Sequence, residues 1–379
     1  MPHVVIDARR IRDFGIGTYI RNLIRALSRL EHKNRYTLIF PSNDISEVLG
    51  LGSNFATATY AHLDTEVMHN IAFPKFLRTL QADLYHIPLN SVAWWMPRPY
   101  VLTIHDMSTL LFPSHRSFRN RMHEQRFRRG ALRASRVIAV STSTRRDVET
   151  VLHVPAERIC TIYSAPDPAF TPDASGPDHG APDQDRQTLE RYSIRKPFIL
   201  YAGTIRPQKN IPRLIEAFAV LRGELENHPE FRDLRLVIIG DELSKYPGVR
   251  RAVVSSRVEN FVRFLGFVPT ETLRVFYRAA AAFAFPSLYE GFGLAPLEAM
   301  ACGTPVVASN LPSLVEALGD AAELVSPDNV FDIARGIRDV LLDQDRRRAL
   351  VIAGPVQARR FDWDHTAQQV LDIYRNIKT

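Results

Sequence analysis

Two glutamates flank a glycine-rich turn in the second half of this 379-residue chain. Glu290 and Glu298 are separated by seven uncharged residues within the stretch "SLYEGFGLAPLEAM". The residues that follow Glu290 are Gly291, Phe292, Gly293 and Leu294. The apolar run before them is typical of a strand that ends near Pro286, and a helix is predicted to begin near Leu294. The motif therefore lies where a strand passes into a helix.

The arrangement of these groups suits a ligand that carries an anion between two sets of hydroxyl groups. First-turn amides of a helix have no intrahelical partner, and together with the helix dipole they favour an anion. Carboxylates in contact with that anion would repel it, whereas carboxylates on either side of it can bind hydroxyls. A nucleotide diphosphate sugar has this order: sugar, diphosphate, ribose. A purely structural role for Glu290 and Glu298 explains the glycines and acids together less well.

A second stretch, "YAGTIRPQKN", combines a strand end with two cations. The strand is predicted to end at Gly203, and Arg206 and Lys209 lie in the loop that follows. Asn210 is predicted to cap the next helix, with Pro212 in its first turn. Two cations beside a glycine suit a diphosphate, and a solvated loop with two ordinary charges is the open alternative.

The pair His105–Asp106 follows the predicted strand "YVLTI" directly. A lone histidine is more often structural than catalytic. Because ligands of open α/β sheets bind beyond the carboxyl ends of the strands, this position favours a functional role for His105.

The N-terminal loop "RDFGIGTYI" places Gly15 and Gly17 between a predicted strand and a predicted helix. Glycines at such a turn permit close approach of the backbone to a phosphate or a sugar. A G-x-G pattern alone is a weak signal, so the loop supports the other motifs without deciding the function.

Elements of two kinds alternate along the chain and must position these groups. Short apolar runs predict strands at residues 3–7, 36–40, 83–87, 100–104, 136–140, 198–203, 234–240, 282–286 and 305–309. Amphipathic segments between them predict helices, and repeated strand–helix units imply parallel sheets covered on both faces.

The amino-acid composition changes between residues 166 and 196, where Pro, Asp and Gly are frequent and the apolar residues follow no helical or strand periodicity. It is typical of an exposed connection. We therefore predict an N-terminal domain over 1–165 and a C-terminal domain over 197–363. The last segment, 364–379, has an apolar helical face that packs on the second domain or reaches back to the first.

Composition excludes several classes of protein. Two cysteines without metal-ligand spacing argue for a reducing compartment and against a disulfide framework. The N-terminus lacks the long apolar core of an export signal, and no stretch is long enough to cross a bilayer. We expect a cytoplasmic protein. The formal charge of +7 suits an anionic partner without identifying it.

One segment, residues 115–136, is rich in arginine. Its arginines are Arg116, Arg119, Arg121, Arg126, Arg128, Arg129, Arg133 and Arg136, interleaved with Phe118, Met122, Phe127 and Leu132. No stacking motif or groove-binding module accompanies them, so we expect no nucleic-acid partner. A solvated helix and a surface for anionic membranes or an anionic acceptor remain open, the second placing the protein at the periphery of the inner membrane face.

Together these motifs resemble the retaining glycosyltransferases of family 4, over nearly the whole chain. The resemblance rests on the E-x7-E motif, the "YAGTIRPQKN" loop, the "HD" pair and the segment "GFVPTETLRVFYRAA". It implies the GT-B fold, in which two Rossmann-like, doubly wound α/β domains face each other across a cleft. Many relatives have adjacent glycines in the first loop, whereas Ile16 separates the two glycines of this chain.

The resemblance also implies roles for the site residues. Glu290 would bind hydroxyls of the donor sugar, and Glu298 the ribose. Arg206 and Lys209 would hold the diphosphate, and His105 would lie by the donor sugar. Further donor-binding positions are Gly15, Gly17, Gly203, Val268 (with the amides of residues 266–268 at the base), Gly291, Phe292, Gly293 and Leu294. The C-terminal helix would cross back to the first domain.

The expected reaction is transfer of a sugar to an acceptor hydroxyl with retention at the anomeric carbon. The first loop contains "GIGTY", which resembles the sequence of mannosyltransferases, so GDP-mannose is the first choice of donor and a UDP-sugar the second. The expected acceptor is a glycan or a lipid-linked molecule. No D-x-D metal motif lies in a suitable place and cations are present, so we expect metal independence and no cofactor. A sugar-nucleotide epimerase is the rival enzyme class.

Overall fold

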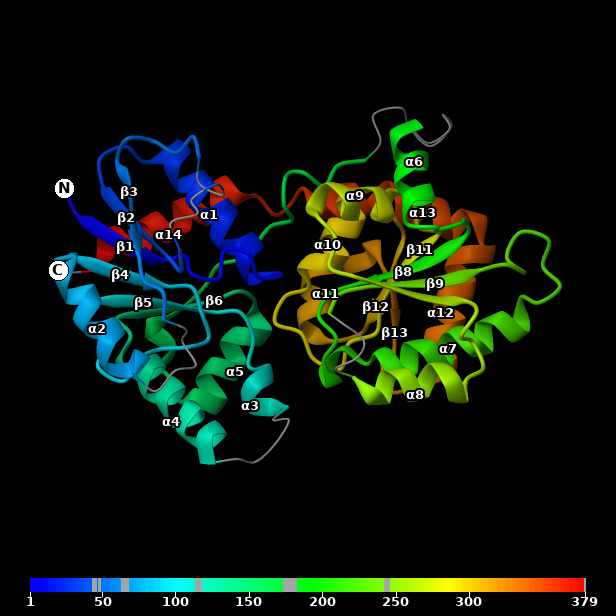
Figure 1. Cartoon of the computed structure of the whole chain (residues 1–379), viewed down its shortest axis with the longest axis horizontal. Helices are drawn as coiled ribbons and strands as arrows, with labels where there is room; N and C mark the ends of the chain where they lie inside the picture. Colours follow the sequence, from blue (N-terminus) through cyan, green and yellow to red (C-terminus); the bar gives the residue numbers. More distant parts are fainter. Residues whose placement is uncertain are drawn as a thin grey trace. The chain divides into compact units, whose positions relative to one another are not determined.

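The chain folds into two compact α/β units (Figure 1) in the computed structural model, which describes residues 1–42, 46, 49–62, 68–112, 118–172, 183–241 and 246–377. Unit 1 is formed by Met1–Ala165 with Phe361–Thr379, and unit 2 by Pro166–Arg360. Each unit contains one parallel sheet, as the alternation of strands and helices predicts.

Unit 1 has a seven-stranded sheet in the order β3-β2-β1-β4-β5-β6-β7. Its strands are β1 (His3–Asp7), β2 (Arg35–Phe40), β3 (Phe55–Thr59), β4 (Leu84–Ile87), β5 (Tyr100–Ile104), β6 (Arg136–Ala139) and β7 (Ile159–Thr161). Its helices are α1 (Ile16–Leu30), α2 (His69–Thr79), α3 (Ser108–Leu111), α4 (Phe118–Arg133), α5 (Thr142–Leu152) and α14 (Trp363–Asn376). Strands β1, β4 and β5 are buried along their whole length, because helices cover both faces.

Unit 2 has a six-stranded sheet in the order β10-β9-β8-β11-β12-β13. Its strands are β8 (Phe198–Ala202), β9 (Arg235–Ile239), β10 (Val262–Gly266), β11 (Ala282–Phe285), β12 (Val306–Ser309) and β13 (Glu323–Val325). Its helices are α6 (Asp183–Arg191), α7 (Ile211–Glu224), α8 (Pro247–Ser255), α9 (Thr270–Ala279), α10 (Leu294–Ala301), α11 (Pro312–Leu318), α12 (Val330–Leu342) and α13 (Gln344–Ala358). Helices α7 and α8 lie on one face of this sheet and α9 and α10 on the other (Figure 1).

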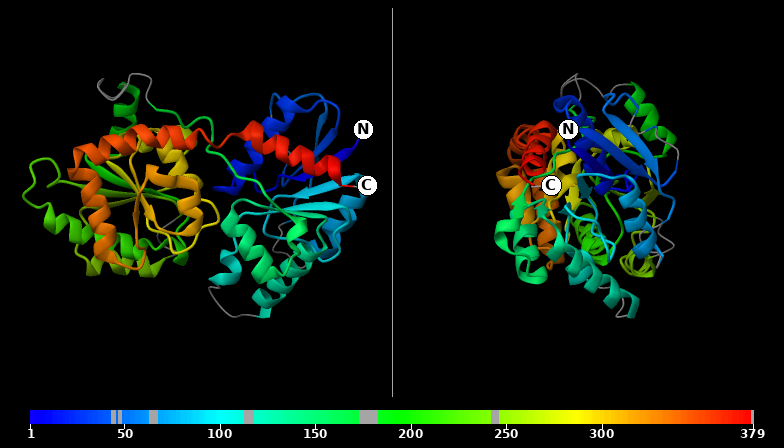
Figure 2. Two further views of the ribbon diagram at one scale, coloured as in Figure 1. Left: turned by 180° about the vertical axis from the view of Figure 1, so that it is seen from behind. Right: turned by 90° about the vertical axis from the view of Figure 1, so that its left-hand side faces the viewer.

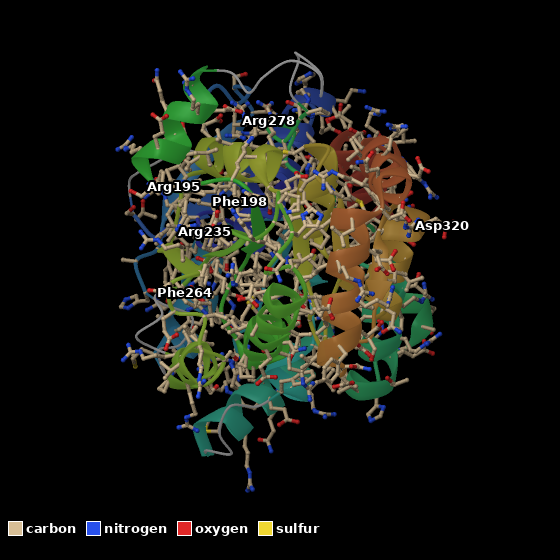
Figure 3. All side chains as sticks on the ribbon, turned by 90° about the vertical axis from the view of Figure 1, so that its right-hand side faces the viewer. Arg195, Phe198, Arg235, Phe264, Arg278 and Asp320 are labelled. Atoms are coloured by element: carbon tan, nitrogen blue, oxygen red, sulfur yellow. The ribbon has the colours of Figure 1, made fainter. Side chains whose placement is uncertain are left out.

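Side chains fill the interior of unit 2. Phe198, at the start of β8, is fully buried, whereas Asp320 lies at the surface (Figure 3). The buried strands of the sheet are the long apolar runs of the sequence, and they determine where the loops at their ends emerge.

Both sheets share a topology that defines a ligand-binding edge. The chain starts in the middle of each sheet, runs outward to one edge, and returns to build the other side. The direction therefore reverses between β1 and β4 and again between β8 and β11. In open α/β sheets, ligands bind at the carboxyl ends of the strands at such a switch point. The two candidate loops of unit 2 follow β8 and β11.

The C-terminal helix α14 belongs to unit 1, where it lies beside α1 (Figures 1 and 2). Trp363 and Tyr374 on α14 are buried, and Arg29 of α1 pairs with Asp364 at its start. The chain thus returns to its first unit after completing the second.

The predicted exposed connection over 166–196 is wrong for part of its length. Asp183–Arg191 forms helix α6, and the preceding residues 173–182 lie outside the described residues. Leu189 of α6 is buried, and the ring of Tyr192 packs edge-on against Phe276 of α9, with centroids 5.5 Å apart. Most residues of α6 are charged or polar, so composition alone did not indicate a helix that buries one leucine.

Candidate active site

Two loops of unit 2 lie against each other at the carboxyl ends of β8 and β11. The side-chain amide of Asn210 donates to the carbonyl of Pro286 at 3.0 Å. The amide of Leu288 donates to the carbonyl of Gln208 at 2.7 Å. These bonds join the "YAGTIRPQKN" loop to the loop that carries the first glutamate, so the two motifs that the sequence singled out form one site.

A third contact between these loops is an ion pair between Lys209 and Glu290. The Lys209 Nζ lies 2.5 Å from Glu290 Oε1, and the two side chains are 17% and 10% exposed. The same Nζ lies 5.2 Å from the ring centroid of Phe285, and Ser313 Oγ donates to the Glu290 carbonyl at 2.8 Å. The sequence motifs predict contacts of these two side chains with different parts of a ligand, and their spacing does not indicate that they pair.

The prediction that Asn210 caps α7 is wrong. Its backbone is left-handed, with φ of 60°, and its side chain makes no cap hydrogen bond. The side-chain amide donates instead to the carbonyls of Pro286 and Pro327, at 3.0 and 2.8 Å. Asn210 is buried and links three loops, and Pro212 lies in the first turn of α7 as the sequence predicts.

Gly293 fixes the geometry of the turn before α10. Its φ is 101°, a region that L side chains rarely adopt, and a Cβ there would lie 2.5 Å from Leu314 Cδ2. Gly291 and Phe292 are buried, and Leu294 begins the helix. The turn therefore presents the N-terminus of α10 at the sheet edge, where backbone amides and the helix dipole favour an anion.

Glu298, on α10, is held by a tyrosine that the sequence analysis missed. The hydroxyl of Tyr277 donates to Glu298 Oε2 at 3.2 Å, and Tyr277 is fully buried. Burial and the neighbouring Glu298 charge raise the pKa of Tyr277 well above its usual value, so its hydroxyl keeps the proton that it donates. Tyr277 lies on the buried face of α9, where helical spacing alone suggests only a core aromatic.

Close packing of the backbone fixes the start of the "YAGTIRPQKN" loop. Gly203 has φ of 149°, and a Cβ on Gly240 would lie 2.1 Å from the Gly203 carbonyl oxygen. Asp241 Oδ2 accepts from the amide of Ile205 at 3.0 Å and from the hydroxyl of Tyr246 at 3.3 Å. Asp241, which the sequence analysis also missed, thus holds the loop that carries the cations.

The remaining unit 2 candidates differ in exposure. Arg206 is exposed, and Val268 is buried with 2% of its surface accessible. Gly266 ends β10 with φ of 66°, and Phe267 is 67% exposed. The Val268 side chain therefore belongs to the core, which leaves the backbone groups of this segment and the exposed ring of Phe267 to meet a base.

His105 of unit 1 has a defined tautomer. Its Nε2 lies 3.1 Å from the Pro88 carbonyl, and its amide donates to Asn90 Oδ1 at 3.2 Å. Burial lowers the pKa of His105 to about 4, so the ring is neutral at pH 7. Because a carbonyl only accepts, Nε2 carries the proton and Nδ1 is the acceptor nitrogen. The Tyr19 ring packs edge-on against His105, with centroids 4.8 Å apart.

Two other predicted features of unit 1 have uses inside the fold. Asp106 Oδ1 accepts from the amide and hydroxyl of Ser108 at the start of α3, at 2.8 and 2.6 Å. Gly15 has φ of 67° and precedes α1, and a Cβ on Gly17 would lie 2.4 Å from the Ile11 carbonyl oxygen. The glycine at 17 is therefore required by its own loop, whatever ligand the loop meets.

The structure shows that the arginines of the arginine-rich segment do not all face solvent. Arg126 is buried and donates to Asn70 Oδ1 and Ser91 Oγ at 3.1 and 3.2 Å. Arg128 donates to the Val151 carbonyl at 2.7 Å. These two arginines hold α4 to the rest of unit 1. Arg126 therefore cannot serve as a surface cation, whereas the side chain of Arg128 is 37% exposed and also pairs with Glu124.

Other members of the segment do lie at the surface. The exposed ones are Arg121, Met122, Arg129, Leu132 and Arg133. Phe127 is buried, and Arg136 is half-buried in β6. Residues 115–117, with Arg116, and the side chains of residues 118–120 lie outside the described part. The exposed members form a smaller mixed surface of cations and apolar side chains.

Two family models match the chain in succession. Residues 15–170 match glycosyltransferase family 4, and residues 185–357 match glycosyl transferases group 1. The first match falls in unit 1 except for residues 166–170, and the second falls in unit 2, where it includes both loops of the candidate site.

Relatives and solved structures agree with these matches. The chain is 33% identical over 306 residues to O-antigen chain mannosyltransferase B of Escherichia coli, covering 79% of this chain and 76% of that protein. It is 30% identical over 299 residues to the serotype-specific mannosyltransferase WbdA of E. coli, covering 77% of this chain but only 34% of WbdA. The solved structure of Anabaena HepE in complex with UDP and glucose matches with a TM-score of 0.76 at 19% identity, covering all of both chains.

Proposed function

Because the chain belongs to the group 1 glycosyltransferases of family 4 and has the GT-B fold, we propose that it transfers mannose from GDP-mannose to a hydroxyl of a glycan acceptor, with retention at the anomeric carbon. The observation that carries this proposal is the joined pair of loops in unit 2, which brings Lys209 and Glu290 beside the start of α10.

The donor is inferred from the relatives. Mannosyltransferase B and WbdA carry mannose transfer in their names, and they match most of this chain. HepE is seen with UDP and glucose, which makes a UDP-sugar the second candidate. The name of mannosyltransferase B refers to an O-antigen chain, so an O-antigen-like or lipid-linked acceptor is also part of the proposal. The chain spans only about a third of WbdA.

The mechanism follows from charge. Departure of the sugar leaves negative charge on the nucleoside diphosphate, and donors aimed at developing charge stabilise the transition state. In this proposal Arg206, Lys209 and the N-terminus of α10 bind the diphosphate. Glu290 accepts hydrogen bonds from sugar hydroxyls, and Glu298 accepts them from the ribose.

His105 is proposed to contact the donor sugar. Its neutral ring has Nδ1 as the acceptor nitrogen, which can receive a hydrogen bond from a sugar hydroxyl. Because the ring is neutral, it does not stabilise the negative charge of the departing diphosphate. In this proposal the cations of unit 2, Arg206 and Lys209, do so.

The test of the proposed function is a screen of nucleotide sugars followed by product analysis. GDP-mannose should raise the melting temperature more than UDP-glucose at equal concentration, because a ligand that binds only the folded state stabilises it. With a glycan acceptor, NMR of the product should show α-linked mannose. Conversion of the donor to an isomer without acceptor would instead identify an epimerase, and stabilisation by no nucleotide sugar would contradict the proposal.

Transfer is proposed to need no metal ion, because two cations and a helix N-terminus can neutralise the leaving diphosphate. Activity in excess EDTA should equal activity in untreated enzyme within about twofold, a change of under 1 kcal/mol in the barrier. Added Mg²⁺ or Mn²⁺ should give no further increase. Loss of activity in EDTA that a divalent ion restores would show that the cations do not suffice.

Tyr277→Phe should weaken recognition of the ribose. The substitution removes the hydroxyl that holds Glu298 and keeps the ring, so KM for the donor should rise about fivefold with kcat little changed. The preference for GDP over 2′-deoxy-GDP or 3′-deoxy-GDP in binding should shrink at the same time. Tyr100→Phe is a matched control, because this buried tyrosine donates to the Gly130 carbonyl of unit 1. Unchanged discrimination in Tyr277→Phe would rule out its role at Glu298.

Membrane attachment is proposed for the exposed part of α4. Within the residues that the structure describes, no helix combines the length and apolar character needed to cross a bilayer. Arg121, Arg129 and Arg133 are exposed beside Met122 and Leu132. Each cation near an anionic bilayer contributes about 1 kcal/mol, so three cations with apolar neighbours support reversible attachment.

Sedimentation with vesicles tests this attachment. The protein should sediment with phosphatidylglycerol vesicles at low salt, and the bound fraction should fall as the salt concentration rises. It should not sediment with phosphatidylcholine vesicles. The triple variant Arg121→Gln, Arg129→Gln, Arg133→Gln should be released. A control with the same loss of charge is Arg195→Gln, Arg251→Gln, Arg348→Gln, all exposed in unit 2, and it should still bind. Equal binding by both triple variants would place the contact elsewhere.

A further inference from the structure

Three residues in a row from one loop are bound to the other loop of the site. Gln208 accepts from Leu288 through its carbonyl, Asn210 donates to a carbonyl at the end of β11, and Lys209 between them pairs with Glu290. The backbone on both sides of Lys209 is therefore fixed. The part of Lys209 that remains able to move is its side chain.

The Glu290 side is fixed in a similar way. Its carbonyl accepts from Ser313 Oγ at 2.8 Å, and the turn after it is restricted by Gly293 and Leu314. The ion pair is largely buried, with 17% of Lys209 and 10% of Glu290 exposed, so water screens it less than it screens a surface pair. Without ligand, the ammonium group already has an anionic partner.

A nucleoside diphosphate requires the same ammonium group. Two anions, the Glu290 carboxylate and the diphosphate, then compete for one cation. When the donor is bound, sugar hydroxyls can satisfy the Glu290 carboxylate, and Lys209 can turn to the diphosphate. After transfer the sugar is gone, and the carboxylate has no partner unless Lys209 returns to it.

We propose that Glu290 competes with the nucleoside diphosphate for Lys209, so that the site holds the sugar-bearing donor well and releases the product diphosphate. This inference rests on the proposed function, because it takes the ligand to be a nucleotide sugar. It adds a role in product release to the sugar contact assigned to Glu290. The exchange requires only rotation of two side chains between fixed backbones.

The test is a double-mutant cycle on the affinity for the product, which needs no acceptor. Dissociation constants for GDP and for UDP are measured by calorimetry with the full-length protein. The four proteins are the wild type, Glu290→Gln, Lys209→Gln and the double variant. Glutamine keeps the size of the glutamate side chain and removes its charge, so the variant should fold, and its melting temperature checks this.

Glu290→Gln should bind the preferred diphosphate about fivefold more tightly than the wild type, an effect at least as large as that of a solvent-exposed charge pair. In the Lys209→Gln background, the same substitution should change affinity by less than about twofold, because the cation in contention is gone. Asp328→Asn is a matched control. It frees Arg213 of unit 2 from an ion pair of 2.8 Å, and it should leave affinity for the diphosphate unchanged.

The outcomes separate this inference from the function on which it rests. If the wild type binds GDP or UDP but Glu290→Gln binds it no more tightly, the competition does not exist. An equal gain in both backgrounds, or in Asp328→Asn, would show a general effect of charge and would also overturn the proposal. If the wild type binds neither diphosphate, the proposed function fails first and the inference with it.

Discussion

Glu290→Gln is expected to lower kcat for sugar transfer by about 100-fold, the scale seen when one preorganised partner of the transition state is removed. The Glu290 backbone is held at the turn before α10, and its carboxylate pairs with Lys209 where hydroxyls of the donor sugar are proposed to lie. A charged acceptor binds hydroxyls more strongly than an amide, and positive charge develops on the sugar as the bond to diphosphate breaks. The measurement is steady-state kinetics with GDP-mannose.

The affinity of Glu290→Gln for GDP is a second expected difference from the wild type. Because glutamine no longer competes for Lys209, slower transfer should come with tighter binding of GDP. Asp328→Asn, which removes an exposed carboxylate of unit 2, should keep the turnover of the wild type. Turnover of Glu290→Gln within about threefold of the wild type would remove Glu290 from the mechanism.

Arg206→Ala is expected to lower kcat by about 100-fold while leaving the melting temperature nearly unchanged. Arg206 is exposed, so truncation creates no cavity and leaves no buried partner. Lys209→Ala should slow transfer to a similar degree, but it also leaves Glu290 without its ion-pair partner and should lower the melting temperature. Kinetics and thermal unfolding on the same preparations separate the two effects.

A control for the arginine is Arg195→Ala, an exposed position of unit 2 before β8 (Figure 3). It should change neither rate nor stability. If Arg206→Ala lost stability in proportion to activity, its role would be in the fold. If it retained full activity, Arg206 would have no part in stabilising the leaving diphosphate.

The sequence predicts the interior of both sheets well and their edges poorly. All nine apolar runs correspond to strands of the structure. The strands that escaped prediction are β3, β7, β10 and β13, which are the four sheet edges. Strands β7 and β13 have three residues each, and β3 is largely exposed. Edge strands bury only part of their surface, so they lack the continuous apolar run that marks a central parallel strand.

Within the candidate site, local motifs were predictable and long-range partners were not. The glycine turn and the positions of the two glutamates follow from strand and helix signals. The pairing of Lys209 with Glu290 joins residues 81 positions apart, and Tyr277 resembles any buried aromatic of a helix. Asn210 has a side chain suited to a cap, yet tertiary contacts use it as a link between loops. Spacing cannot reveal contacts that only the packed fold creates.

The arginine-rich segment shows that a sequence pattern can also suggest a surface larger than the one the fold exposes. Its charge suggests one continuous surface, but Arg126 bonds inward from a helix whose Phe127 is also buried. Arginine has a long apolar stem and several donors, so it can hold a fold as readily as it can face solvent. Count and spacing of cations therefore overestimate the surface that is available for binding.

The most direct test of the central claim is a crystal structure of the full-length protein with GDP-mannose or, if transfer exhausts the donor, with GDP. We expect the diphosphate to lie at the carboxyl ends of β8 and β11, within hydrogen-bonding distance of Arg206, Lys209 and the first amides of α10. The ribose should contact Glu298. A nucleotide bound in unit 1, or in unit 2 without contact to either cation, would show that the two loops of unit 2 are not the donor site.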